Sequence, residues 1–542
     1  MTRRPTKTLR VGEGRFLRRE KAEILVIGTG IAGCTAAITA SASGKRVLVI
    51  TKTGDPMESN TRYAQGGIAA VGERDSKEIL YDDIMNAGDG ISNPAAVRVV
   101  VDEGPDQVRD FLVGELGVSF SKNTDGSYNY TREAAHSRKR ILHHYDMTGL
   151  EIEKRLIEKL ESIRNVTLLS GHTAIEFITS HHNSRNPLAA YGKNLCLGAY
   201  TLNNDTGEVS SLLADATIVA TGGIGRLYQY TTNPDCATGD GIAMAFRAGA
   251  EAANMEYVQF HPTMFYAPEG GGFLISEAVR GEGGRLLDGH GEEFMKRYAP
   301  KARELAPRDE VARAIYNEMA CTGSSHVFLD IARFAGKGLN VRERFPGIYE
   351  ECMKRKVDIE KEPIPVVPAE HYFCGGVLAG DWGETTLPGL FAVGECSCTG
   401  MHGANRLASV SLLEGMVYGR RAGIMASTAE KKDEHFKEIP DWMHPRRMRE
   451  ESNDPLLILQ DWNHLKTTMW NYVGIIRTET RLNRAESDLR NLHSRITDYY
   501  RNTTISRQKI ELRNGVIVAN LIAQFARRNR KAIGCHYIKD EE

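Results

Sequence analysis

One short segment near the N-terminus constrains the fold of this 542-residue chain more than any other. Residues 24–27 (ILVI) are apolar, residues 28–33 (GTGIAG) form a glycine turn, residues 34–43 are rich in alanine, and residues 47–50 (VLVI) are apolar again. A buried strand, a glycine turn, a helix and a second buried strand make a β-α-β unit. The backbone N–H groups at the start of such a helix favour a pyrophosphate. The segment therefore predicts a Rossmann-like dinucleotide-binding domain rather than a merely tight turn.

The residues that follow bear on which dinucleotide binds. An NAD site usually has an acidic residue about 20 positions after the glycine turn, but here the second strand ends in Thr51 and Lys52. A plain NAD site is therefore not favoured. Residues 60–67 (NTRYAQGG) form another glycine-rich loop. Its backbone amides can face a flavin ring or its diphosphate, and the alternative interpretation is an ordinary surface turn.

The nucleotide-binding domain is expected to be discontinuous. Apolar strands recur at 216–220 and 389–393, and each enters a glycine turn. Beyond about residue 440 glycine thins out, and apolar residues at three- and four-residue steps predict helices. We expect an α/β fold with a discontinuous Rossmann-like FAD-binding domain, an inserted α+β capping domain and a C-terminal helical bundle. The expected boundaries are 1–20 for a basic tail, 21–254 and 371–438 for the nucleotide domain, 255–370 for the cap and 439–542 for the helices.

Charge, cysteine content and hydropathy exclude several classes of protein. Lys plus Arg (69) balance Asp plus Glu (70) for a net charge of -1, so no nucleic-acid partner is expected. The nine Cys contain no CxxC pair, so neither a metal site nor a disulfide framework is predicted, and reduced cytoplasmic thiols are the default. No apolar run reaches the ~18 residues of a membrane-spanning helix. The basic residues 1–20 suit a disordered tail better than a transit segment.

Ten motifs, the two glycine segments included, occur in a fixed order along the chain. They are GTGIAG, SNTRYAQGG, ATGG, TGDGIAMAFRAGA, QFHPT, SEAVRGEGG, PRDEVARAI, HYFCGGV, GEC and HGANRLASVSLLEG. Together they resemble the flavoprotein family of fumarate reductase, succinate dehydrogenase and L-aspartate oxidase, over about residues 23–537. The resemblance implies FAD as the cofactor.

The resemblance also implies which residues hold FAD. Membrane-bound relatives attach the flavin through a His just after the Ser of the second glycine loop, and Asn60 stands there in this chain. FAD is therefore expected to be non-covalent. The implied FAD-binding residues are Gly28, Thr29, Gly30, Ile31, Ala32, Gly33, Lys52, Asn60, Thr61, Arg62, Tyr63, Ala64, Gln65, Gly66, Gly67, Asp240, Glu395, Ser411 and Leu412.

A substrate with two carboxylates needs several converging cationic or hydrogen-bonding groups. Taken alone, a His is more often a structural residue and an Arg more often a surface ion-pair partner. Arg308 in PRDEVARAI resembles the catalytic arginine of the family, which exchanges a proton with the substrate, and Glu277 and Arg280 are its implied proton route. The implied substrate-binding residues are His261, Ser276, His371, Arg406 and Ser409.

Glu133, in the run TREAAHSRKRILH, separates substrates within the family. In the succinate and fumarate enzymes the corresponding segment carries an uncharged polar residue, whereas this Glu resembles the aspartate-oxidising members. A carboxylate would repel succinate but would pair with a substrate ammonium. The competing interpretation is a solvent-facing Glu paired with Arg132 or Arg138.

The activity implied is FAD-dependent oxidation of L-aspartate to iminoaspartate, the first step of NAD synthesis from aspartate. Oxygen, giving hydrogen peroxide, or fumarate is the implied electron acceptor, and quinolinate synthase is the plausible functional partner. Three alternatives stay open: a soluble fumarate reductase or succinate dehydrogenase subunit, a nonenzymatic FAD-binding module, and a flavoprotein that docks on a membrane complex through its helical C-terminus.

Two positions depart from the family pattern. Val410 stands where the family motif has Asn, and Ile533 stands where the aspartate oxidase signature has Ser before GCHY. The first change is expected to alter hydrogen bonding beside Arg406 and Ser411. An unsatisfied neighbour costs roughly 1–3 kcal/mol, so we expect activity below the family norm.

Overall fold

The computed structural model describes residues 19–268, 272–334, 338–443 and 454–539. A seven-stranded sheet lies at its centre, in the order β6-β2-β1-β9-β8-β7, with β16 paired to β9. Four strand pairs in it are parallel, and β8 runs antiparallel to both β7 and β9. The strands are β1 (Arg19–Ile27), β2 (Val47–Ile50), β6 (Val166–Leu169), β7 (His172–Thr179), β8 (Cys196–Asn203), β9 (Val209–Val219) and β16 (Leu390–Ala392).

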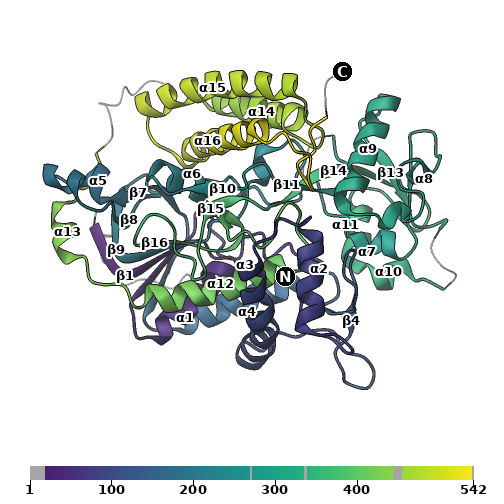
Figure 1. Cartoon of the computed structure of the whole chain (residues 1–542), viewed down its shortest axis with the longest axis horizontal. Coiled ribbons are helices and arrows are strands. Elements are labelled where there is room, and N and C mark those ends of the chain that lie inside the picture. The colour runs from purple at the N-terminus through teal and green to yellow at the C-terminus, as the bar shows by residue number, and fades with distance from the viewer. Residues whose placement is uncertain (1–18, 269–271, 335–337, 444–453, 540–542) are drawn as a thin grey trace, which may run out of the picture.

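Helices cover both faces of this sheet, which explains the uninterrupted apolar runs in β1 and β2. Successive side chains of a strand point to opposite faces. Ile24 and Val26 accordingly join the core beneath α1 (Ile31–Ala42) and α12 (Ser411–Ala426), whereas Leu25 joins the core shared with α6 (Asp240–Arg247). Figure 1 shows α1 and α12 below the sheet and the C-terminal helices above it.

The predicted β-α-β unit is confirmed as β1, α1 and β2. The strand expected at 216–220 is only the end of β9, whose first half, including Ser210 and Ser211, pairs with β8 in an antiparallel hairpin. Arg19 and Glu20, expected in the basic tail, are instead the first residues of β1 and pair with β9. The rest of that tail, residues 1–18, lies outside the described residues.

The cap has its own four-stranded antiparallel sheet, in the order β11-β14-β13-β12. The helices α7, α9 and α11 enclose a separate apolar core with it, at the right of Figure 1. The long strands β11 and β14 join the cap to the rest of the chain, and the expected boundary at 370 falls inside β14. The bounds are β11 (Val258–Phe265), β12 (Arg285–Leu287), β13 (Val327–Asp330), β14 (Ile364–Phe373), α7 (Glu277–Gly281), α9 (Arg308–Thr322) and α11 (Pro346–Lys354).

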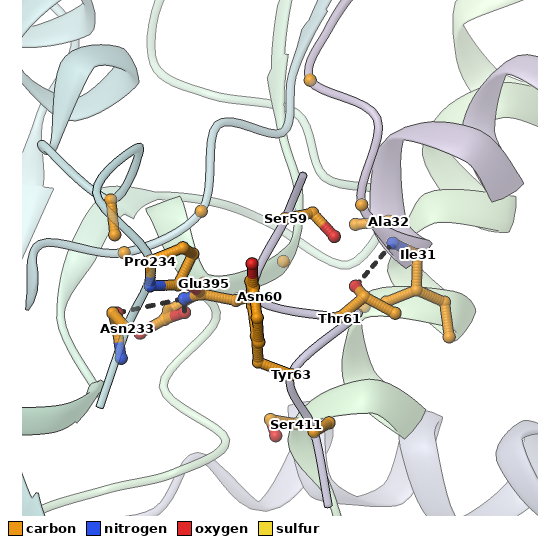
Figure 2. A pocket seen from close by; sticks show the side chains of 18 of the residues that line it. Ile31, Ala32, Ser59, Asn60, Thr61, Tyr63, Asn233, Pro234, Glu395 and Ser411 are labelled. Atoms are coloured by element: carbon orange, nitrogen blue, oxygen red, sulfur yellow. Dashed lines mark hydrogen bonds between the residues drawn. The ribbon is translucent and has the colours of Figure 1, made fainter. Parts of the chain in front are cut away.

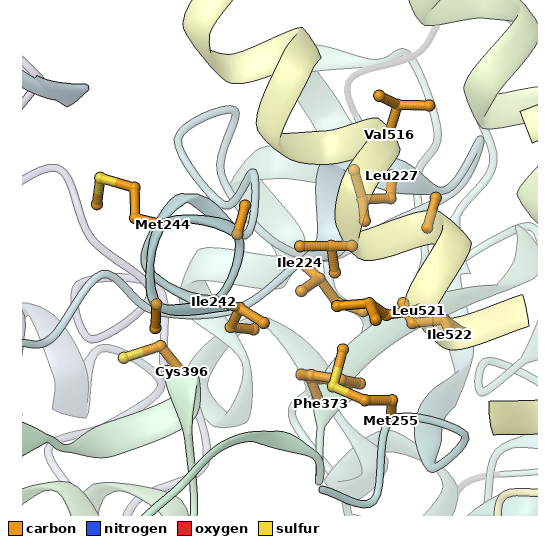
Figure 3. Close-up of a cluster of buried hydrophobic side chains, with 14 of the residues drawn as sticks. Ile224, Leu227, Ile242, Met244, Met255, Phe373, Cys396, Val516, Leu521 and Ile522 are labelled. Atoms are coloured by element: carbon orange, nitrogen blue, oxygen red, sulfur yellow. The ribbon is translucent and has the colours of Figure 1, made fainter. Parts of the chain in front are cut away.

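The predicted C-terminal helical bundle is confirmed as α14 (Pro455–Tyr472), α15 (Glu479–Asn502) and α16 (Arg507–Arg528). The apolar positions that predicted it, from Leu482 to Ile496, are buried in α15, although Ile475 precedes that helix. Figure 3 shows Val516, Leu521 and Ile522 of α16 facing the side chains around α6. None of the helices in the described ranges has the length and apolar composition needed to cross a bilayer.

Candidate active site

Most of the predicted site residues line a single long cleft. It is walled by the glycine turn after β1, the loop 59–67, the start of α12, and the facing ends of β11, β14 and α9. Three predicted residues do not line it. Gly33 lies under the turn, Arg62 pairs with Asp55 at 2.9 Å on the surface, and Arg280 is fully buried behind Glu277. All the other predicted site residues contribute to its wall.

At one end, which we call the nucleotide end, the wall is made of backbone. Gly28 has φ +114°, and a Cβ there would lie 2.1 Å from the carbonyl oxygen of Ala220. α1 begins directly after Gly30, and the backbone N–H of Ile31 donates to Thr61 Oγ1 at 2.9 Å. The positive end of the helix and the side-chain-free turn together form a site suited to a phosphate.

A hydrogen-bonded group from four distant segments forms the middle of the cleft. Asn60 Nδ2 donates to Glu395 Oε2 at 2.8 Å and to Asn233 Oδ1 at 3.1 Å (Figure 2). The backbone N–H of Phe373 donates to Glu395 Oε1 at 3.1 Å. Burial nevertheless raises the pKa of Glu395 to about 7, so this carboxyl changes charge near neutral pH.

Several buried polar atoms on the cleft wall have no protein partner. They include Asn60 Oδ1, Gln65 Oε1, Arg308 Nη1 and Arg406 Nε. Buried polar atoms in folded proteins are nearly always hydrogen-bonded. Their distribution along the cleft fits a long polar ligand, such as the FAD implied by the resemblance, followed by a second anionic group.

The other end of the cleft, the substrate end, is lined by charged and hydrogen-bonding side chains. The rings of His261 and His371 lie with centroids 5.1 Å apart. Burial, reinforced by nearby arginines, lowers the pKa of both rings well below its usual value. His371 Nδ1 lies 2.8 Å from the hydroxyl of Thr232. Both rings are therefore neutral at pH 7 and can donate hydrogen bonds to a carboxylate without carrying charge.

Arg308 and Glu277 form a buried ion pair across the cap. Arg308 Nε donates to Glu277 Oε2 at 2.7 Å, and the other carboxylate oxygen accepts from Ala134 N at 2.8 Å. Burial would raise the pKa of Glu277, but the charges of Arg308 and Arg280 outweigh it and lower the pKa to about 2. The pKa of Arg308 is raised, because the attraction of Glu277 and Glu133 exceeds the effect of burial. The structure thus brings Arg308, Glu277 and Arg280 together in the predicted order.

Glu133 faces the cleft rather than solvent. Its Oε2 accepts from Ser409 Oγ at 2.6 Å, and a Cβ on Gly66 would lie 2.2 Å from its Oε1. In the part of the chain that the structure describes, neither Arg132 nor Arg138 makes an ion pair with it. The competing interpretation of Glu133 as a surface ion-pair partner is therefore wrong for this structure.

Arg406 is buried beside Glu133, and an aromatic ring packs against its guanidinium. Its guanidinium lies 4.6 Å from the ring centroid of Tyr372, and its Nη1 reaches Ser411 Oγ at 3.3 Å. Val410 is fully buried in the apolar core and supplies no side-chain cap to α12. An Asn side chain carries an oxygen that can accept from the first N–H groups of a helix, and Val410 offers none beside Arg406.

Sequence reasoning missed several residues of the cleft. Tyr372 adjoins His371 in the HYFCGGV motif, so that motif held a signal for it. Asn233, by contrast, comes from a turn between motifs and carried no signal. The other missed lining residues include Thr51, Ser59, His172, Thr173, Thr232, Pro234, Cys236, Met244 and Leu274.

Two family models and several known proteins match this chain. Residues 23–412 match the family model of an FAD binding domain, and residues 462–542 match that of the fumarate reductase flavoprotein C-term. The chain is 43% identical to L-aspartate oxidase 1 of Ralstonia nicotianae, over 96% of this chain and 95% of that protein. It is 43% identical to the L-aspartate oxidase of Halobacterium salinarum, over 96% of each. The chloroplastic L-aspartate oxidase of Arabidopsis thaliana is 40% identical, over 96% of this chain and 81% of that protein.

Solved structures show the same fold. A quinol fumarate reductase of E. coli superposes with a TM-score of 0.84 at 29% identity, covering 97% of this chain and 92% of that one. The adenylylsulfate reductase of Archaeoglobus fulgidus shares the fold with a TM-score of 0.69 at 18% identity, covering 96% and 90%. The fold therefore supports more than one redox substrate, and the side chains at the substrate end must decide between them.

Proposed function

This chain belongs to the L-aspartate oxidase family of FAD-binding oxidoreductases, and from that premise we propose that it oxidises L-aspartate to iminoaspartate. The single observation that carries the proposal is Glu133, a carboxylate placed among groups that bind carboxylates. His261, Arg308, His371 and Arg406 all line the same end of the cleft. A diacid alone would meet repulsion from Glu133, whereas an amino diacid offers it an ammonium.

The four carboxylate-binding groups divide into two charged and two neutral donors. Arg308 and Arg406 supply positive charge, and the neutral rings of His261 and His371 supply directed hydrogen bonds. A carboxylate makes charge-assisted hydrogen bonds with both kinds of donor, but only the arginines add the attraction of an opposite charge, which a buried site screens weakly. We propose that the arginines provide most of the binding free energy and that the histidines fix the orientation of the substrate.

Bound FAD supplies the redox chemistry, because it accepts two electrons from the substrate. The chain's own task is to present the α-carbon, keep water out and handle protons. Glu133 would hold the substrate amino group, and Ser409 would fix the direction of Glu133 through its 2.6 Å hydrogen bond. Arg308 would exchange protons when fumarate is reduced, with Glu277 and the buried Arg280 behind it as the route.

The nucleotide end and the middle of the cleft would hold FAD. The glycine turn, Lys52, the loop at 60–67 and the start of α12 are the proposed contacts. Asn60 occupies the position of the flavin-linking His in membrane-bound relatives, and an amide side chain is no nucleophile for such a bond. Non-covalent binding of FAD is therefore part of the proposal.

Oxygen or fumarate is the proposed electron acceptor. A pocket built for a four-carbon amino diacid also fits fumarate, and among the described residues no group of His, Cys, Asp or Glu is arranged to hold a metal. Iminoaspartate hydrolyses readily, so a quinolinate synthase that consumes it promptly is the proposed functional partner. The nine free thiols favour a reducing compartment such as the cytoplasm.

Anaerobic flavin bleaching tests the proposal. The purified yellow protein is mixed with L-aspartate or with succinate in separate experiments, and flavin absorbance is followed before air is admitted and peroxide is assayed. We expect bleaching by L-aspartate and peroxide on admission of air. Bleaching by succinate alone would contradict the proposal and favour a fumarate reductase or succinate dehydrogenase subunit, to which the likeness to E. coli quinol fumarate reductase points.

A further inference from the structure

The C-terminal helical bundle contacts the nucleotide end of the cleft through one face of α16. Arg507, Glu511 and Asn514 lie at steps of four and three residues, which places them on one side of the helix. All three reach residues that line the cleft or their direct partners. The bundle is otherwise without an assigned role.

The centre of this contact is the ammonium group of Lys52. Its Nζ donates to Asp240 Oδ2 at 2.6 Å, to Thr238 Oγ1 at 2.6 Å and to Glu511 Oε1 at 2.9 Å. A lysine ammonium has three N–H donors, so these three acceptors fix its position. Of the two carboxylates, Asp240 lines the cleft and Glu511 lies behind it.

The rest of the α16 face completes the network. Arg507 Nε donates to Glu511 Oε1 at 2.8 Å, and its Nη1 reaches the backbone oxygen of Lys52 at 3.2 Å. Asn514 Nδ2 donates to Asp240 Oδ1 at 2.8 Å. The charges of Lys52 and Arg507 therefore balance those of Asp240 and Glu511. Both carboxylate oxygens of Asp240 accept hydrogen bonds.

Apolar packing holds α16 in register with this network. α6 begins at Asp240, and its Ile242 belongs to the same buried core as Val516, Leu521 and Ile522 of α16 (Figure 3). A Cβ added to Gly239, just before α6, would lie 3.1 Å from Val518 Cγ2. Docking of α16 against α6 therefore places Glu511 near Asp240, and Lys52 Nζ contacts both carboxylates.

We propose that Glu511, supported by Arg507 and Asn514, is a positioning residue for FAD, which makes the C-terminal helical bundle part of the cofactor site. Glu511 acts through Lys52 and Asp240, the two cleft residues that it and Asn514 hold. Because Lys52 and Glu511 lie in a mostly buried network of two cations and two carboxylates, removing either charge leaves the network with an unbalanced charge. FAD binding and docking of the bundle are consequently linked, each favouring the other. The inference rests on the proposed FAD contact of Lys52.

FAD titration of the FAD-free protein tests the inference. We expect Glu511→Gln to weaken FAD binding about tenfold, and Lys52→Met to weaken it at least as much. The double variant should bind FAD no more weakly than Lys52→Met, because Glu511 acts through Lys52. The matched control is Glu486→Gln, which breaks the 2.6 Å ion pair with Arg527 inside the bundle and should leave FAD affinity unchanged.

Three results separate the possible failures. Unchanged FAD affinity in Glu511→Gln, or a full additive loss in the double variant, would overturn the positioning role. Unchanged affinity in Lys52→Met would instead overturn the FAD contact of Lys52 on which the inference rests. Hydrogen exchange can be measured on the wild-type protein and so does not depend on whether a variant folds. FAD should slow amide exchange in residues 507–518. Equal exchange rates with and without FAD would contradict the linkage between FAD binding and docking of the bundle.

Discussion

The two ends of the cleft are built from different parts of the chain. At the nucleotide end much of the wall is backbone, namely a glycine turn with φ +114° at Gly28 and the first turn of α1, with the side chains of Lys52 and Asp240 beside it. At the substrate end the wall is side chain, with Arg308, Arg406, His261 and His371 brought together from α9, β11, β14 and the loop before α12. Backbone can bind a phosphate in many proteins, whereas a set of charged side chains selects one substrate. The first end therefore defines the family, and the second defines the reaction.

The sharpest way to separate the two ends is to remove Arg308. We expect Arg308→Leu to lower turnover about 10³-fold or more, because a preorganised charge is lost where the reaction occurs. FAD content should be unchanged, since Arg308 lies at the substrate end. Stopped-flow flavin reduction and flavin absorbance measure the two quantities.

The control for Arg308 lies on the same helix. Arg313 pairs with Asp309 at 2.8 Å and does not line the cleft, so Arg313→Leu should keep most of the turnover. Full activity in Arg308→Leu would show that the substrate end does not depend on this charge.

The opposite experiment damages the nucleotide end alone. Gly28→Ala places a Cβ 2.1 Å from Ala220 O at a backbone conformation that favours glycine. Overpacking and backbone strain each cost about 1–3 kcal/mol, so we expect FAD affinity to fall about 100-fold or more. Gly54→Ala, at an exposed position with open space around it, is the control. FAD retained at wild-type affinity in Gly28→Ala would contradict the role of the turn.

The contrast between the ends also explains what the sequence could and could not predict. The nucleotide end follows from local pattern, because strand, turn and helix are contiguous in residues 24–43. His261 and Arg406 are 145 residues apart by number, so only the family resemblance assigned them to one pocket. The hairpin of β8 and β9 carries a weaker pattern, because Gly198 interrupts the apolar run of β8, and Ser210 and Ser211 interrupt that of β9.

Three predicted residues show the limit of motif transfer. Gly33 and Arg62 sit inside the correct motifs yet do not line the cleft. Gly33 packs against the carbonyl oxygen of Gly28 beneath the turn, and the Arg62 side chain pairs with Asp55 on the surface. Arg280 is close to Glu277 but buried behind it. Conversely, Asn233 reaches Asn60 from a turn with no motif, a contact that depends on tertiary packing alone.

Glu395 lies where the two ends meet, and its titration tests whether they are electrostatically joined. Burial raises its pKa from 4.5 to about 7 in the folded protein. Because the pKa of Glu395 is higher in the folded than in the unfolded protein, the stability that this carboxyl contributes is fully present below pH 4.5. That contribution is lost as the pH rises to about 7. A shift of this size is worth about 3 kcal/mol.

Denaturant unfolding of the FAD-free protein at pH 5 and pH 8 measures this loss. The wild type should lose up to about 3 kcal/mol more than Glu395→Gln over that interval. The exposed Glu161 provides the control, since Glu161→Gln should follow the wild type. Parallel losses in wild type and Glu395→Gln would contradict the raised pKa.

The most direct test of the division between the ends is to neutralise Glu133 and compare two ligands. Glu133→Gln keeps the shape of the side chain and removes its charge, and a hydrogen bond to a charged group contributes about 1.5–3 kcal/mol. Glu115→Gln, which breaks an exposed ion pair with Lys159 away from both cavities, is the matched control. The measurement is the affinity of the FAD-loaded variant for L-aspartate and for fumarate. In Glu133→Gln, aspartate should bind about 10- to 100-fold more weakly, while fumarate should bind as well as before or better. An equal loss of affinity for both ligands, or no loss of affinity for aspartate, would contradict the role of Glu133 in selecting the substrate.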